Sequence, residues 1–119
     1  ARDTSQLIAS RGSSRPSEAP TEGTIAGMAY YKVLQVHATA YTHTGRRTST
    51  GVVPTVGTVA VDPRVIPYGT KMYIPGYGVG IAQDTGSAII GNRIDVFFNT
   101  KREALNWGRR NITIYLLKD

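Results

Sequence analysis

Residues 79–98, VGIAQDTGSAIIGNRIDVFF, contain the pattern that decides the fold. Two short apolar segments, residues 79–84 and 94–98, flank a stretch rich in glycine and small polar residues. Apolar runs of this length that are bounded by turn-forming residues are typical of β-strands. One aspartate, Asp84, ends the first segment, and another, Asp95, lies inside the second. The stretch therefore predicts two strands that each carry a carboxylate.

Similar segments occupy most of the chain on both sides of this stretch. The segment KVLQVHATAYT alternates in part, with Val36, Ala38 and Ala40 on one face, as expected of a half-buried strand. Prolines and glycines separate the segments from one another. The expected strands are residues 32–42, 57–62, 71–74, 79–84, 94–98 and 112–117. About six short strands with little helix predict an all-β barrel.

One helix is expected between the last two strands. Thr100 and Glu103 have the spacing of a capping box, in which the threonine hydroxyl accepts a backbone N–H and the glutamate reaches back. Gly108 is placed to end this helix. Trp107 lies in its last turn and is expected to pack in the core.

The 119 residues are enough for one domain. Residues 1–29 are rich in Ser, Pro, Gly, Thr and charge, and we expect a polar N-terminal arm or linker there. Residues 30–119 are expected to form the barrel domain. The arm is expected to lie outside the barrel core, either disordered or packed on a neighbouring molecule, and a homodimer formed through the arm is one such arrangement.

The chain carries a formal net charge of +6 and has no cysteine. A basic surface favours a polyanionic environment, such as nucleic acid or a bacterial wall, although a plain solvated surface has the same composition. The basic residues form scattered doublets without interleaved aromatics, so nucleic acid is not expected. No apolar run is long enough to insert into a membrane. We expect a secreted or wall-associated bacterial protein, with any leader or anchor outside this sequence.

Acidic residues are few outside the arm. Glu103 is explained by the helix cap and Asp119 is the last residue, which leaves Asp62, Asp84 and Asp95. Each of the three could cap a turn, which is an ordinary structural role for aspartate. Asp95 differs because a strand disfavours aspartate, and a carboxylate inside an apolar run needs a partner, a cleft or a proton. Asp95 is therefore the strongest catalytic candidate from the residues alone.

The sequence Asp84-Thr85-Gly86-Ser87 also occurs in the active-site turn of aspartic proteases. Those enzymes need two such turns, from two lobes or two chains, and a supporting apolar-apolar-glycine segment that follows a flap hairpin. Here the segment Ile89-Ile90-Gly91 follows almost at once and leaves no chain for a flap. The protease interpretation is therefore rejected.

The order VAVDPRVIPYGTKMYIPGYG, AQDTGSAIIGNRIDVFF and EALNWGRRNITIYLL resembles the three-aspartate (3D) domain of bacterial cell-wall proteins. It is similar to stationary-phase survival proteins of the YuiC type and to the catalytic barrel of membrane-bound lytic transglycosylase A. The resemblance covers about residues 36–117. It implies a six-stranded double-psi β-barrel with one short helix, and the signature aspartates fall on Asp62, Asp84 and Asp95.

The activity implied by this resemblance is lytic cleavage of the peptidoglycan glycan strand, between N-acetylmuramic acid and N-acetylglucosamine. Ordinary glycosidases use two carboxyl groups, whereas lytic transglycosylases use one that acts first as acid and then as base. The resemblance places this acid at Asp95, with Asp84 and Asp62 orienting it or tuning its charge. Neither histidine has a partner at ligand spacing, so no metal site and no cofactor are expected.

Further candidates concern the substrate. Gly86 and Gly91 would let the backbone approach a sugar, and the hydrogen-bonding candidates are Thr85, Ser87 and Asn92. Thr39 and Tyr41 resemble the cleft-lining Thr-x-Tyr of the family, although a tyrosine on a strand is more often plain packing. Many relatives have a basic residue where this chain has Ile90. A non-catalytic module that binds cell-wall glycan is the alternative function, because fold does not fix activity.

Overall fold

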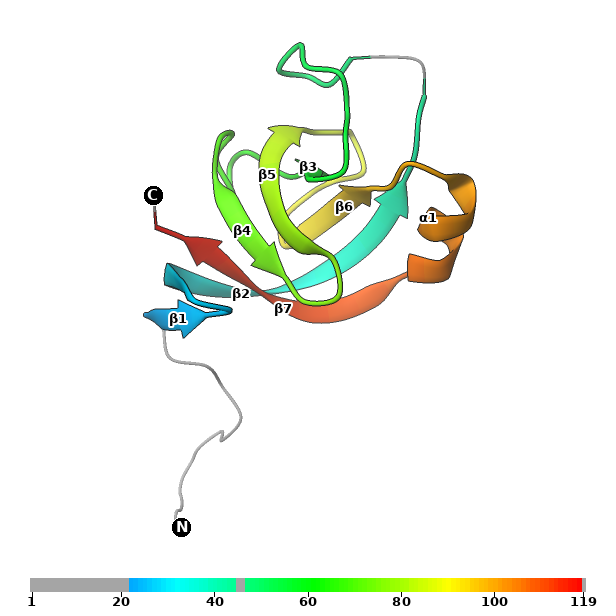
Figure 1. Cartoon of the computed structure of the whole chain (residues 1–119). Helices are drawn as coiled ribbons and strands as arrows, with labels where there is room; N and C mark the ends of the chain where they lie inside the picture. Colours follow the sequence, from blue (N-terminus) through cyan, green and yellow to red (C-terminus); the bar gives the residue numbers. More distant parts are fainter. Residues whose placement is uncertain (1–21, 45–46, 119) are drawn as a thin grey trace.

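The computed structural model describes residues 22–44 and 47–118 (Figure 1). Within these ranges the chain forms seven strands and one helix, in the order β1 (Gly23–Ile25), β2 (Met28–Tyr41), β3 (Thr58–Ala60), β4 (Lys71–Ile74), β5 (Gly78–Asp84), β6 (Arg93–Phe97), α1 (Lys101–Trp107) and β7 (Arg110–Leu117). None of the helical residues in this part of the chain belongs to a segment long and apolar enough to cross a bilayer.

Six strands close into a barrel in the order β2-β6-β3-β5-β4-β7, and β7 pairs back onto β2. The pairs β2–β6 and β3–β5 are parallel, and the remaining pairs are antiparallel. Figure 1 shows the long strands β2 and β7 side by side, with β4 and β5 crossing over them. The predicted all-β, six-stranded double-psi barrel with one short helix is confirmed.

The first strand of the barrel begins earlier than the sequence pattern indicated. β2 starts at Met28 and forms a hairpin with β1. Ala26 and Gly27 connect the two with φ of 51° and 79°, the positive values that a two-residue hairpin turn requires. Residues 23–29, expected in the arm, are therefore largely paired into the sheet. Residues 1–21 lie outside the described residues, and the domain boundary and the arm-mediated homodimer stay predictions.

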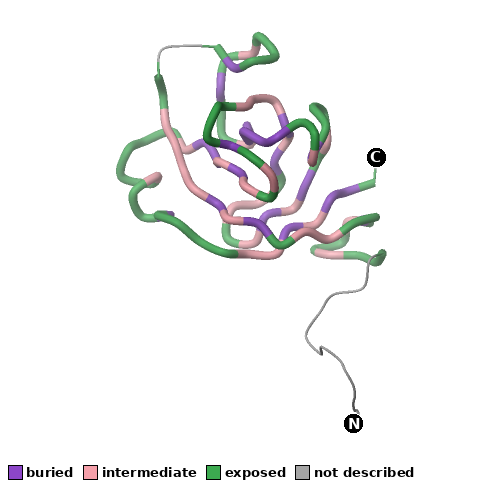
Figure 2. The backbone as a smooth tube through the Cα atoms, turned by 180° about the vertical axis from the view of Figure 1, so that it is seen from behind, coloured by how far each residue is buried: buried purple, intermediate pink, exposed green. Residues whose placement is uncertain are grey.

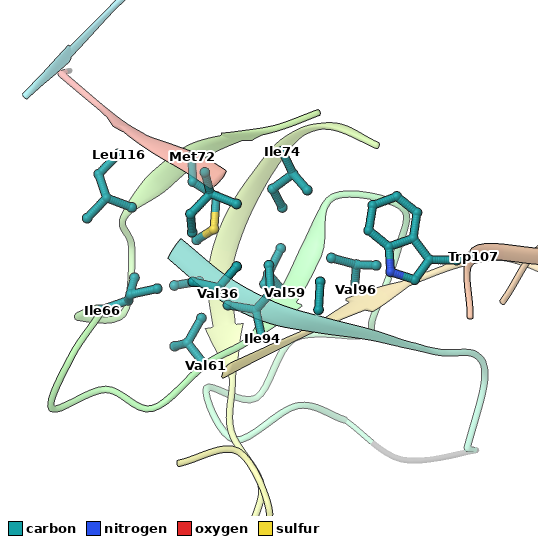
Figure 3. Packing of buried hydrophobic residues seen from close by; sticks show 13 residues of the cluster. Val36, Val59, Val61, Ile66, Met72, Ile74, Ile94, Val96, Trp107 and Leu116 are labelled. Carbon is teal, nitrogen blue, oxygen red and sulfur yellow. The ribbon is translucent and has the colours of Figure 1, made fainter. Parts of the chain in front are cut away.

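The core is filled by alternate residues of the strands, as their spacing predicts. On β2, Val36 is 4% exposed and Ala38 is fully buried, and the neighbouring strand β6 contributes the fully buried Ile94 and Val96. Exposed residues are concentrated in the connections and the helix (Figure 2). Side chains from β2, β3, β4, β6 and β7 meet inside the barrel, and Trp107 closes one end (Figure 3).

The helix is capped at the predicted residues. The Thr100 hydroxyl oxygen accepts a hydrogen bond from the Glu103 backbone N–H, and Gly108 ends the helix with φ of 65°. The second hydrogen bond of the predicted capping box is different. The Glu103 carboxylate accepts from the Thr100 hydroxyl rather than from a backbone N–H. Trp107 is 4% exposed, so the expectation that it belongs to the core is confirmed.

Candidate active site

The strand register aligns four residues in one row across the barrel wall. Thr39 of β2 pairs with Asp95 of β6, Asp95 pairs with Ala60 of β3, and Ala60 pairs with Asp84 of β5. Asp95 points away from the core, because its neighbours on β6 are buried. The β3–β5 register shifts by one residue before Ala60, and this irregularity brings Asp84 into the row, so that both carboxylates line the same cavity. Two strand spacings separate them, about 10 Å between Cα atoms. The small methyl group of Ala60 lies between them and leaves space above it.

This space is a cavity of about 340 Å³. Loops cover the row from two sides, and Figure 1 shows the β2–β3 connection rising at the end of the barrel where β5 ends. The cavity is lined by Tyr41, Ala60, Asp84 and Asp95 on the wall, by Thr44, Arg47 and Pro54 from the β2–β3 connection, and by residues 85–89 from the β5–β6 connection.

Asp95 is half-buried in this cavity, and its neighbours on β6 point into the core. Thr39 Oγ1 donates a hydrogen bond to Asp95 Oδ1 at 3.0 Å. Burial raises the pKa of the Asp95 carboxyl, and the negative charge of Asp84 raises it further. The Thr39 hydrogen bond and the positive charge of Arg93 oppose this rise in pKa. Asp95 therefore holds its proton at higher pH than an ordinary aspartate, which suits a general acid.

Asp84 anchors the loop that covers the cavity. Its Oδ1 accepts hydrogen bonds from Ser49 N and Ser49 Oγ, both at 2.9 Å, and from Thr85 N at 2.8 Å. Beside it, Thr50 Oγ1 donates to the Gln83 carbonyl at 2.8 Å. Asp84 therefore places a negative charge near Asp95 and also fixes Ser49 against the end of β5, where the Gln83 carbonyl holds Thr50.

Tyr41 contributes a phenol side chain to the same cavity. Its hydroxyl is buried and makes no hydrogen bond of good geometry with a described residue, although Asp84 is near enough to interact with it. Burial raises the pKa of the Tyr41 hydroxyl far above its usual value, and the charges of Asp84 and Asp95, together with the Asp84 interaction, add to the rise. The ring packs edge-on against Phe97 at 5.4 Å between centroids, which fixes its position. Tyr41 is thus a neutral hydrogen-bond donor held beside the two carboxylates.

Asp62 has a different environment. It is 4% exposed, and Arg64 donates from Nε to Oδ1 and from Nη2 to Oδ2, both at 3.0 Å. The backbone N–H groups of Arg64 and Gly91 add bonds of 3.0 and 2.8 Å. The Arg64 guanidinium and these N–H groups hold the pKa of the Asp62 carboxyl well below its usual range. Asp62 neither lines the cavity nor contributes to the pKa shift of Asp95, so its contacts are those of a structural clamp.

The β5–β6 connection divides the remaining candidates into two groups. Thr85, Gly86 and Ser87 line the cavity, whereas Gly91 and Asn92 do not. Gly91 has φ of 70°, a value that favours glycine, and its N–H is the one bound by Asp62. Asn92 Nδ2 donates to the Gln35 carbonyl at 3.1 Å and so ties the start of β6 to β2. Ile90 is 63% exposed and also lies outside the lining.

Residues of the site that sequence reasoning missed come from β3 and the β2–β3 connection. Sequence alone shows no catalytic pattern at these positions, which are Ala60, Arg47, Ser49 and Thr50. A signal was present, because residues 43–56 form a long connection rich in Ser, Thr and Gly, and such loops are frequently functional. Among the described residues no three His, Asp or Glu side chains gather as metal ligands would.

The profile of the 3D domain family matches residues 57–118, which contain all three candidate aspartates. The chain belongs to the 3D domain family. Two proteins of Bacillus subtilis (strain 168) are similar to this 3D domain over 94 residues, or 72% of the chain. YabE, whose name refers to cell wall shaping, is 48% identical, and the cell wall-binding protein YocH is 46% identical. The matched region spans only 23% of YabE and 33% of YocH.

Solved structures show the same fold for the 3D domain. The crystal structure of MltA from E. coli superposes with a TM-score of 0.51 at 23% identity, over 61% of this chain and 27% of MltA. A structure of E. coli MltA with bound chitohexaose superposes with a TM-score of 0.50 at 20% identity, over 61% of this chain and 28% of that chain. At this level of identity the similarity establishes the barrel fold.

Proposed function

We propose that this 3D domain is a lytic transglycosylase of peptidoglycan, which cleaves the β-1,4 bond between N-acetylmuramic acid and N-acetylglucosamine. The observation that carries the proposal is Asp95, a half-buried carboxyl of raised pKa that faces a cavity beside a second carboxylate. The cavity lies on the outer wall of the barrel, where a polymer can reach it. Action at the bacterial cell wall, outside the cytoplasm, is part of the proposal, and the names of YabE and YocH support it.

In the first step the Asp95 carboxyl donates its proton to the glycosidic oxygen, and the bond between that oxygen and the anomeric carbon breaks. The Asp95 carboxylate then accepts the proton of the muramic acid 6-hydroxyl, whose oxygen bonds to the anomeric carbon. The products are a 1,6-anhydro muramic acid end and a free 4-hydroxyl on N-acetylglucosamine, and no water is consumed. Because one group serves as acid and base, its pKa needs to lie near the working pH, and the pKa of Asp95 is shifted in that direction from the ordinary aspartate value.

The surrounding residues have distinct roles in this proposal. Asp84 raises the pKa of Asp95 through its charge, and Thr39 orients the carboxyl through Oδ1. Tyr41 remains neutral because its own pKa is raised, and its side chain forms part of the cavity wall beside the two carboxylates. Thr85, Gly86 and Ser87 line the path of the glycan strand. Each proton movement is assigned to a side chain of this chain, so the proposal requires no cofactor or metal.

The test is digestion of purified peptidoglycan followed by mass spectrometry of the released fragments. We expect 1,6-anhydro-muramyl products from the wild type and none above background from Asp95→Asn. Glu103→Gln is the matched control, because it removes a carboxylate at the helix cap, outside the cavity, and should leave product release unchanged. Products with only hydrated reducing ends would make the domain a hydrolase and contradict the anhydro mechanism.

A non-catalytic cell-wall-binding module is the second candidate, and the name of YocH is the observation that favours it. Co-sedimentation with peptidoglycan separates the two functions. A pure binding module would be retained by the wall without releasing fragments, and Asp95→Asn would bind as well as the wild type. Fragment release that is lost in Asp95→Asn would exclude this alternative.

A further inference from the structure

Arg47 is the single basic side chain among the described residues that line the cavity. It is exposed, and the ion pair found between described residues joins Arg64 to Asp62 and leaves Arg47 out. Arg93 is close enough to affect the pKa of Asp95, yet it does not line the cavity. A ligand in the cavity therefore meets two carboxylates and one guanidinium.

The position of Arg47 is set by hydrogen bonds within its own loop. Arg47 Nη1 donates a hydrogen bond to the Gly51 carbonyl at 3.1 Å. Two backbone hydrogen bonds close the turn: Thr48 N donates to the Val52 carbonyl at 2.8 Å, and Gly51 N donates to the Thr48 carbonyl at 2.9 Å. Ser49 ties this turn to Asp84 through two further bonds. The guanidinium is thus held at the cavity with one N–H engaged and its other donors left for a ligand. A guanidinium in this state is suited to bidentate recognition of a carboxylate.

A neutral glycan gives this arginine nothing to pair with, whereas an anionic ligand would be repelled by Asp84 and Asp95 unless a cation offset them. Muramic acid differs from N-acetylglucosamine by a lactyl ether that ends in a carboxyl group, which is either free or amide-linked to a peptide stem that carries carboxylates of its own. We infer that Arg47 binds a carboxylate on the muramic acid residue or its stem, and so makes the cavity select peptidoglycan over neutral N-acetylglucosamine polymers. This inference rests on the proposed function, because it assumes that the cavity binds the glycan strand.

The experiment measures binding by isothermal titration calorimetry at low salt, without any requirement for turnover. The probes are three forms of the disaccharide N-acetylglucosaminyl-N-acetylmuramic acid, which lacks the bond that the proposed reaction cleaves. One form has a free lactyl carboxylate, one has it converted to a methylamide, and one carries a peptide stem on it. The proteins are the wild type, Arg47→Gln, Arg47→Lys and Lys71→Gln. The last is a charge-matched control at an exposed lysine that does not line the cavity.

We expect the wild type to bind the free carboxylate about tenfold more tightly than the methylamide, the size of one charge-assisted contact at an exposed site. Arg47→Gln should lose this preference while its affinity for the methylamide stays within about twofold. Lys71→Gln should retain the preference and Arg47→Lys should retain part of it. Tight binding of the stem form would identify stem carboxylates as the group bound, and weak binding would identify the lactyl carboxylate.

Equal binding of all three probes by the wild type would overturn the inference and leave the proposed function standing. The inference would also be overturned, with the proposed function left standing, if Arg47→Gln kept the preference for the free carboxylate. The same conclusion would follow if Lys71→Gln lost as much of the preference as Arg47→Gln, because that would reveal a bulk charge effect. Failure of the wild type to bind any of the probes would count against both the inference and the assignment of the cavity to glycan.

Discussion

Asp62 follows strand β3 and Asp95 lies within β6, and their carboxylates meet opposite surroundings. Asp62 receives four hydrogen bonds, two of them from the Arg64 guanidinium, and its pKa is lowered. Asp95 receives one from Thr39, lies beside another carboxylate, and its pKa is raised. At Asp95 burial outweighs the single hydrogen bond and raises the pKa, whereas at Asp62 the hydrogen bonds outweigh burial and lower it. A carboxylate with many partners stabilises the fold, and one with few partners is available for proton transfer.

Replacement of Asp95 by Asn is expected to have the largest effect on activity. Release of anhydro products should fall at least about a hundredfold, because the variant has no proton to donate or accept. A raised folded pKa means that the charged form costs stability once the pH exceeds the unfolded value, so removal of the charge should leave the melting temperature at pH 7 unchanged or higher. Mass spectrometry and thermal unfolding measure the two effects. A folded variant with wild-type turnover would end the assignment of Asp95 as the acid.

Replacement of Asp84 by Asn should have the next largest effect, roughly a tenfold to hundredfold loss of product release. The asparagine oxygen can still accept from Ser49 and Thr85, so the variant removes the charge and keeps the loop anchored. Without that charge the pKa of Asp95 falls, and the alkaline limb of the pH–rate profile should move to lower pH.

Ser49→Ala is the complementary control, because it removes one loop contact to Asp84 and keeps the carboxylate. The alkaline limb should stay in place in this variant. If the limb moved equally in both variants, loop position rather than charge would govern Asp95.

Replacement of Asp62 by Asn should affect stability rather than chemistry. The melting temperature should fall by about 5 °C at pH 7, while activity per folded molecule stays within about threefold of the wild type. The pKa of Asp62 is lowered on folding, so its stabilisation is complete above the unfolded aspartate value of about 3.9 and is lost as the pH falls toward the folded value. The gap in melting temperature between wild type and variant should therefore begin to narrow below about pH 4 and keep narrowing as the pH falls further.

Arg64→Gln removes the other partner of the same ion pair and should reproduce this behaviour. A hundredfold loss of activity in folded Asp62→Asn would instead place Asp62 with Asp95 and Asp84 in the reaction.

Replacement of Thr39 by Val should reduce turnover less than Asp84→Asn does, and it should move the pH–rate profile in the opposite direction. The change removes the hydroxyl that donates to Asp95 Oδ1 and keeps a similar volume. Because that hydrogen bond lowers the pKa of Asp95, its loss should raise the pKa and move the alkaline limb of the profile to higher pH. We expect only about a twofold to tenfold loss of turnover. A limb that moved to lower pH would contradict the assignment of this limb to Asp95.

Local residue patterns were enough to predict most elements of secondary structure. The strand at Lys71–Ile74 and the helix with its caps at Thr100 and Gly108 were predicted from turn residues, short apolar runs and capping chemistry, which act within a few residues. The alternation on β2 gave the inward face correctly. Asp95 was selected from the sequence because a strand gives aspartate no structural role, a reason that is also local.

The grouping of the site was decided by tertiary structure. Thr39 and Asp95 are 56 positions apart, and Ala60 and Asp84 join their row only through the pairing of β6, β3 and β5. Strand register depends on how all the strands close the barrel, and no single segment encodes it. The same closure brings Gly91 to Asp62 and Ser49 to Asp84, and so makes one aspartate a clamp and another the anchor of the loop that carries Arg47. Residue type determined which side chains could do chemistry, and long-range pairing determined which of them meet.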